Sequence, residues 1–345
     1  MLRGKQRNPA WLKYAAAVAI IHVAGIALLL VNCGRYPQLI GLGFVAYTLG
    51  LRHAFDADHI AAIDNVVRKL VQQKKKPLGV GFFFSIGHSS VVFIMAVITT
   101  FSMKWAQDNI PYLKDAGKLL GTAVSGLFLI VIGLVNLFIW FEVFALFKNV
   151  NKGGYNNEQL DELLLKRGFI SRFLGPFYRR INKSWHVYPL GFLFGLGFDT
   201  ASEVALLAVS ASLVTQVIPL SAIISLPIIF AAGMSLMDTA DGVFMTTAYN
   251  WAFSTPLRKL YYNLSVTGLS VVAALVIGLI ELLQLLTLKL NLRNGAWKWI
   301  QGLDLGSIGY LLAGLFVVFW LFSYILWKVL RLEKVQNKIN DQAEE

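Results

Sequence analysis

Two histidines and three aspartates crowd the stretch LRHAFDADHIAAIDN, residues 51–65, which is otherwise largely apolar. Imidazole and carboxylate groups together form a ligand set for a divalent transition metal of borderline softness. On an ideal helix Asp56 lies between His53 and His59, about 60° from each. The spacing therefore predicts a metal site in this segment.

The two histidines cannot hold one metal from an uninterrupted helix. Six residues place His53 and His59 about 9 Å apart along the axis and about 120° apart around it. Two nitrogens on one metal lie only about 4 Å apart, because each bond is roughly 2 Å. Either the two histidines serve different sites, or the helix breaks near residues 53–59; we favour a break, as in transporters whose irregular backbone lines a cavity. Asp58 points away from this face and is predicted to accept the second N–H of an imidazole.

Ionisable groups also lie in other apolar segments: His88, Asp199, Glu203, Asp238 and Asp241. The two acidic pairs have helical spacings of four and three residues, so each pair shares a helix face. Such groups are costly inside a membrane and usually mark a substrate or ion pathway. Gly87, Ser89 and Ser90 flank His88 in FFFSIGHSSVVF, where small and hydroxyl side chains allow close contact and hydrogen bonds between helices.

The elements that position these groups are predicted to be membrane helices. The chain is 57% hydrophobic and only 14% charged, against about 25% charged in soluble domains. Repeated apolar runs are long enough to cross a bilayer of roughly 30 Å. We predict an all-α polytopic membrane protein, a single transmembrane domain over residues 1–345. Its eight predicted spans are 14–32, 38–63, 78–101, 119–147, 187–213, 217–247, 260–289 and 305–330.

Lysine and arginine concentrate at the two ends and in alternate loops, chiefly 66–77, 148–186 and 248–259. The positive-inside rule then places both termini in the cytoplasm, with the protein in the cytoplasmic membrane. The 148–186 loop is the one sizeable cytoplasmic segment and includes a predicted amphipathic helix, NNEQLDELLLKRGF. The net charge of +12 fits contact with anionic membrane lipids rather than nucleic acid, because the bases are scattered over loops.

Several functional classes are disfavoured by what the sequence lacks. The single cysteine, Cys33, excludes an internal disulfide and a multi-cysteine metal site. No phosphate-binding glycine loop occurs, so the chain carries no ATP-hydrolysing engine. We expect no cofactor beyond the metal ion as transported substrate. The alternatives are a permease for zinc or manganese and a His/Asp membrane acyltransferase; a histidine-rich oxygenase needs more than five histidines.

Four motifs in order resemble the nickel/cobalt transporter (NiCoT) family of membrane permeases: RHAFDADHIAAIDN, FFFSIGHSSVVF, LGFDTASEVALL and GMSLMDTADGVFM. The resemblance implies high-affinity uptake of nickel or cobalt by one polypeptide, with no ATPase partner required. It also implies that His53, Asp58 and His59 carry the essential metal-handling motif. The other family blocks contain His88, Asp199, Glu203, Asp238 and Asp241, and two further positions of the resemblance are Asn136 and Ser202.

A weak internal repeat relates FDADHIAAID to FDTASEVALL, each followed by a helix with a polar cluster ending in Val-Phe. On the predicted topology this would make helix pairs 2–3 and 5–6 an inverted repeat, with the site between them at the membrane midplane. The sequence leaves open whether transport is uniport or coupled to protons. It also leaves open the preference between nickel and cobalt.

Overall fold

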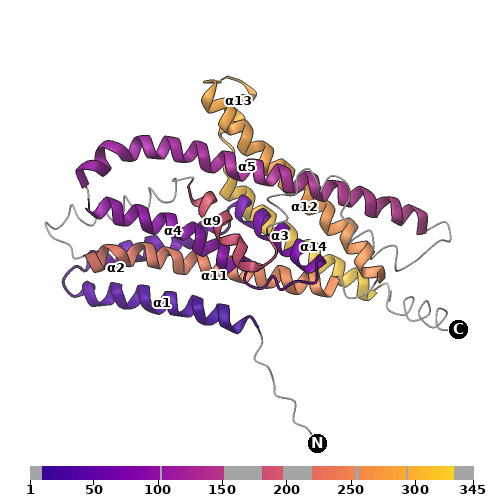
Figure 1. Cartoon of the computed structure of the whole chain (residues 1–345), viewed down its shortest axis with the longest axis horizontal. Helices are drawn as coiled ribbons and strands as arrows, with labels where there is room; N and C mark the ends of the chain where they lie inside the picture. Colours follow the sequence, from indigo (N-terminus) through magenta and orange to yellow (C-terminus); the bar gives the residue numbers. More distant parts are fainter. Residues whose placement is uncertain are drawn as a thin grey trace, which may run out of the picture.

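The computed structural model describes residues 10–101, 103–150, 181–196, 220–252, 256–292 and 294–329. Every regular element in these residues is a helix. The elements are α1 (Leu12–Cys33), α2 (Gln38–His53), α3 (Ala57–Gln72), α4 (Val80–Phe101), α5 (Met103–Val150), the 3₁₀ turn η1 (Ser184–Val187), α9 (Tyr188–Gly195), α11 (Leu220–Ala252), α12 (Pro256–Lys289), α13 (Ala296–Gln301) and α14 (Leu305–Val329). Figure 1 shows α1, α2, α4 and α11 running alongside one another.

The predicted all-helical membrane class is confirmed, but the count of eight spans is not. Five segments in the described residues are long and apolar enough to cross a membrane: Leu12–Cys33, Val80–Val97, Leu119–Phe138, Leu220–Trp251 and Thr267–Lys289. The predicted second span, 38–63, is divided between α2 and α3, each 16 residues long, or about 24 Å. The predicted fourth span began at residue 119, whereas α5 begins at Met103, because an apolar window marks the membrane-embedded part of a helix and not its end.

Part of the predicted fifth span, 187–213, lies in α9, and the rest falls outside the described residues. The same holds for the amphipathic helix predicted in the 148–186 loop and for one half of the inverted repeat. These three predictions remain predictions.

The break expected near residues 53–59 is present. α2 ends at His53 and α3 begins at Ala57, with Asp56 in an extended conformation at the start of α3 (ψ 140°). α14 supports this break, because Gly309 lies so close that an added Cβ would collide with the carbonyl oxygen of Phe55. A glycine at 309 therefore lets the irregular backbone pack against a helix.

α3 lies in the interior of the bundle (Figure 1), in contact with α4, α5, α11, α12 and α14. Only Asp58 and Gln72 among its 16 residues are not buried. Two basic residues, Arg68 and Lys69, are each 1% exposed. A helix this enclosed needs partners for its polar side chains, because an unpaired buried polar group is costly.

A hydrogen-bond network supplies some of those partners. The Asp64 carboxylate accepts hydrogen bonds from the hydroxyl groups of Tyr249 on α11 and Ser270 on α12. The Asn65 side-chain oxygen accepts one from the Asn136 amide on α5 at 2.7 Å. All five side chains are buried. The network ties α3 to three neighbouring helices and fixes its position beside the break.

Replacing Gly81 with alanine is expected to destabilise the contact between α4 and α11. An added Cβ would collide with the backbone carbonyl of Asp238, and overpacking a tight contact costs about 1–3 kcal/mol. Gly41→Ala is the matched control, since nothing lies within 4 Å of a Cβ at Gly41. The melting temperature of the purified protein should fall by several degrees for Gly81→Ala alone. Equal melting temperatures for both variants would contradict this packing.

Candidate metal centre

Three imidazoles converge where α2 and α3 meet. His53 is the last residue of α2, His59 lies in the first turn of α3, and His88 lies on α4. Their ring centroids are 4.6 to 4.9 Å apart. One nitrogen from each ring lies within 4.8 Å of the other two. The break thus removes the separation that an ideal helix would impose on the two α2–α3 histidines.

The nitrogen positions suit a metal ion. The Nε2 atoms of His53 and His88 are 3.0 Å apart. Two ligands at right angles on one metal, with bonds of roughly 2.1 Å, are separated by about 3.0 Å. Small movements of the His59 ring would add a third nitrogen. The cluster can therefore hold a divalent transition metal through two or three imidazoles.

Two of the three imidazole rings have a carboxylate next to their Nδ1 atom. The Asp56 carboxylate lies 2.7 Å from Nδ1 of His53, and the Asp238 carboxylate on α11 lies 3.4 Å from Nδ1 of His59. A carboxylate at one ring nitrogen holds the ring in place and increases the basicity of the other nitrogen. Nε2 of His53, opposite its carboxylate contact, faces Nε2 of His88.

The role predicted for Asp58 is not the one the structure shows. Its carboxylate accepts the backbone N–H of His59 at 2.9 Å and faces the Ser125 hydroxyl at 3.5 Å. The imidazole contacts belong instead to Asp56 and Asp238. The reason is the break, which turns residue 56 back toward His53 and leaves Asp58 to satisfy a free N–H in the first turn of α3.

The cluster is enclosed on most sides. His59 is fully buried, and the Phe84 ring packs against it edge-on with ring centroids 4.8 Å apart. The accessible side lies at the His53–Asp56 pair, whose side chains are 17% and 24% exposed. A metal ion would therefore reach the cluster past this pair.

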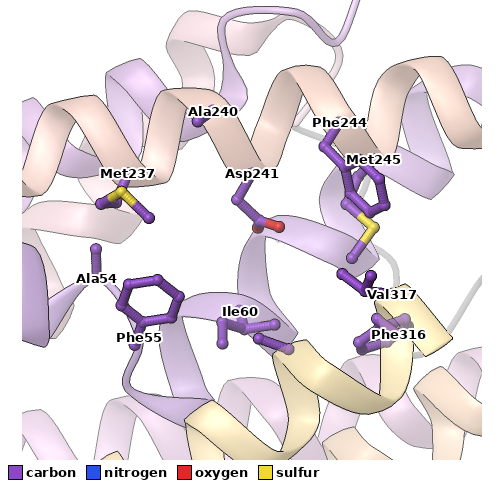
Figure 2. A pocket seen from close by; sticks show the side chains of 11 residues that line it. Ala54, Phe55, Ile60, Met237, Ala240, Asp241, Phe244, Met245, Phe316 and Val317 are labelled. Atoms are coloured by element: carbon purple, nitrogen blue, oxygen red, sulfur yellow. The ribbon is translucent and has the colours of Figure 1, made fainter.

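The remaining predicted site residues are not part of the three-histidine cluster. Asp241, one turn beyond Asp238 on α11, points into a separate cavity (Figure 2). Asn136 does not belong to the cluster and bonds to Asn65 instead. Ser89 is buried next to His88, and its hydroxyl has no hydrogen-bond partner among the described residues. Three predicted residues lie outside the described residues: Asp199, Ser202 and Glu203.

Comparison with known proteins identifies the family. A family model described as "High-affinity nickel-transport protein" matches residues 39–326. The chain belongs to this family. The resemblance to the nickel/cobalt transporters is thereby confirmed.

Members of this nickel-transport family are similar to the chain over most of its length. The nickel transporter NixA of Staphylococcus aureus is 54% identical, with 95% of this chain and 97% of the relative covered. The high-affinity nickel-transport protein NixA of Helicobacter pylori is 50% identical, with coverages of 92% and 97%. The cobalt transport protein NhlF of Rhodococcus rhodochrous is 41% identical, with 76% of each chain covered. No solved structure matches the chain.

Proposed function

We propose that the chain is a permease, not an enzyme, that takes up nickel, cobalt or both across the cytoplasmic membrane. The observation that carries the proposal is the cluster of His53, His59 and His88 at a helix break inside the membrane. The names of the relatives, which include nickel and cobalt transporters, support these two ions as substrates.

In this proposal the ion approaches past His53 and Asp56, exchanges water for imidazole nitrogens, and is held by the histidine cluster. The carboxylates beside the rings increase the basicity of the imidazole nitrogens, which supports high-affinity capture of the ion. The basic loops place both termini in the cytoplasm. Uptake into a cytoplasm that is electrically negative carries positive charge down the membrane potential. Two charges gain about 4.6 kcal/mol per 100 mV, which is enough to drive accumulation without ATP, with or without proton coupling.

Uptake of radioactive nickel by cells that express the protein tests the proposal. Expression should raise uptake well above that of cells carrying an empty vector, and excess cobalt should compete. Zinc and manganese in the same excess should compete less. Uptake equal to the empty vector at verified membrane expression would refute the proposal. Stronger competition by zinc or manganese would reassign the substrate.

Asp56→Asn is expected to weaken the apparent affinity for nickel by about 10–100-fold, the usual effect of losing a carboxylate that orients a metal-binding histidine. The amide removes the negative charge next to Nδ1 of His53 with little change in size. Asp304→Asn makes the same chemical change at an exposed position before α14 and should leave the affinity nearly unchanged. Titration of uptake against nickel concentration measures both. An unchanged affinity in Asp56→Asn would show that this carboxylate does not support the cluster.

A further inference from the structure

A cavity of about 240 Å³ opens beside the histidine cluster, between α3, α11 and α14. Its lining includes Phe55 from the break, Ile60 from α3, Met237 and Met245 from α11, and Ala313 and Phe316 from α14. Figure 2 shows the Asp241 carboxylate pointing from α11 into this space. The C-terminal helix α14, which carries none of the four motifs, thus forms one wall of a space next to the site.

Among the described residues that line the cavity, Asp241 is the one polar side chain, and it offers a group that water can solvate. One oxygen of Asp241 is buried and has no hydrogen-bond partner among the described residues. A buried carboxylate without a partner is costly, and intramembrane acids usually face an aqueous cavity or the bundle interior. The cavity far exceeds the roughly 10–15 Å³ that one water molecule requires. Several water molecules can therefore solvate both the carboxylate and an ion.

Two neighbouring carboxylates on α11 lie one at the cluster and one at the cavity. Asp238 contacts His59, and Asp241 lies three residues later on the same helix. Residues at this spacing have Cβ atoms about 5–6 Å apart. An ion leaving the imidazoles can therefore pass to one carboxylate and then to the next.

The directions of α3, α11 and α14 place the cavity on the side of the cluster that is predicted to face the cytoplasm. α3 and α11 run parallel, because His59 contacts Asp238 and, further along both helices, Asp64 contacts Tyr249. α14 starts beside the break at Gly309 and also runs away from it. α3 ends at Gln72, within the predicted 66–77 loop, and α14 leads toward the C-terminal tail; both regions are predicted to be cytoplasmic.

We propose that this cavity is the water-filled vestibule through which the divalent ion leaves the histidine cluster for the cytoplasm, with α14 as its wall. This inference rests on the proposed function. The apolar lining gives the ion little to bind, so Asp241 is its last protein contact before water. An obstruction in the cavity should accordingly stop transport while the cluster still binds nickel.

Cysteine labelling tests the vestibule. In a Cys33→Ala background, Ala313→Cys introduces a thiol into the cavity, and Leu311→Cys introduces one on the outer face of α14, where Leu311 is 64% exposed. In a membrane this outer face would lie against lipid. The probe is a charged, membrane-impermeant methanethiosulfonate ammonium reagent. Only a hydrated thiol forms the reactive thiolate, so in inverted membrane vesicles Ala313→Cys should react roughly tenfold faster than Leu311→Cys. Neither should react in intact cells.

Full labelling of Ala313→Cys should abolish nickel transport by that variant, while nickel binding to the purified labelled protein persists. Met237→Cys, on the opposite wall, provides a second position if Ala313→Cys does not accumulate. Equal reaction rates at 311 and 313, labelling from outside intact cells, or undiminished transport after full labelling would each overturn the vestibule. These failures are distinct from failure of the proposed function, in which the unmodified protein would not transport nickel at all.

Discussion

Replacing His59 with alanine is expected to reduce nickel uptake to the background of cells that lack the protein. His59 is fully buried at the centre of the cluster, between the other two imidazoles and Asp238. Loss of an orienting group typically costs about 10–100-fold in metal affinity, and loss of a nitrogen ligand should cost more. Radioactive nickel uptake, with an immunoblot for the amount of protein in the membrane, measures the effect.

His22→Ala is the matched control for this substitution. His22 lies on α1, where its ring contacts the Val18 carbonyl and the Tyr47 hydroxyl and takes no part in the cluster. This variant should retain most of the uptake. Similar losses in both variants would mean that any intramembrane histidine is needed for folding. Near-normal uptake in His59→Ala would remove His59 from the site.

Asp64→Ala is expected to destabilise the protein by about 1–3 kcal/mol for each buried hydroxyl group that loses its acceptor. The substitution leaves the Tyr249 and Ser270 hydroxyl groups without their acceptor. It also leaves the buried Arg68 without its nearby negative charge. The purified variant should melt at a markedly lower temperature than the wild type.

A double variant separates lost charge balance from lost packing. If an uncompensated arginine causes the destabilisation, Asp64→Ala combined with Arg68→Met should melt at a higher temperature than Asp64→Ala alone, because an apolar side chain carries no buried charge that lacks a partner. An equal or lower melting temperature in the double variant would contradict the charge-balance explanation. An unchanged melting temperature in Asp64→Ala would show that the network contributes little to stability.

The break between α2 and α3 could be predicted because two requirements conflicted. The residue types of His53 and His59 indicated one metal site, while an ideal helix would hold the two rings too far apart. The contact of His88 with the other two histidines could not be derived from helix spacing, because His88 reaches the cluster only through the packing of α4. That packing depends on close approaches such as Gly81 against α11.

The roles of the acidic residues were harder to predict. Helical periodicity suggested that Asp58 would orient an imidazole, but periodicity fails once the helix is interrupted. Asp56 then reaches His53 across the break. Asp238 reaches His59 from a helix far away in the sequence, and only tertiary packing determines which of two acids three residues apart faces the ring.

The burial of α3 also escaped prediction. The positive-inside rule assigned its two consecutive basic residues, Arg68 and Lys69, to the start of a cytoplasmic loop. Both are buried. The signal that could have indicated this was Asp64 with Asn65 on the same segment, since polar residues one turn before a base can compensate it inside a bundle. Asn136, noted only through the family resemblance, completes this network.

X-ray absorption spectroscopy of the purified protein loaded with one equivalent of nickel tests whether nickel binds at the cluster of His53, His59 and His88. We expect imidazole scattering from two or three nitrogens at about 2.0–2.1 Å, close to metal–imidazole distances in zinc sites, and a loss of one imidazole in His59→Ala. A spectrum with oxygen ligands alone, unchanged in His59→Ala, would contradict nickel binding at this cluster.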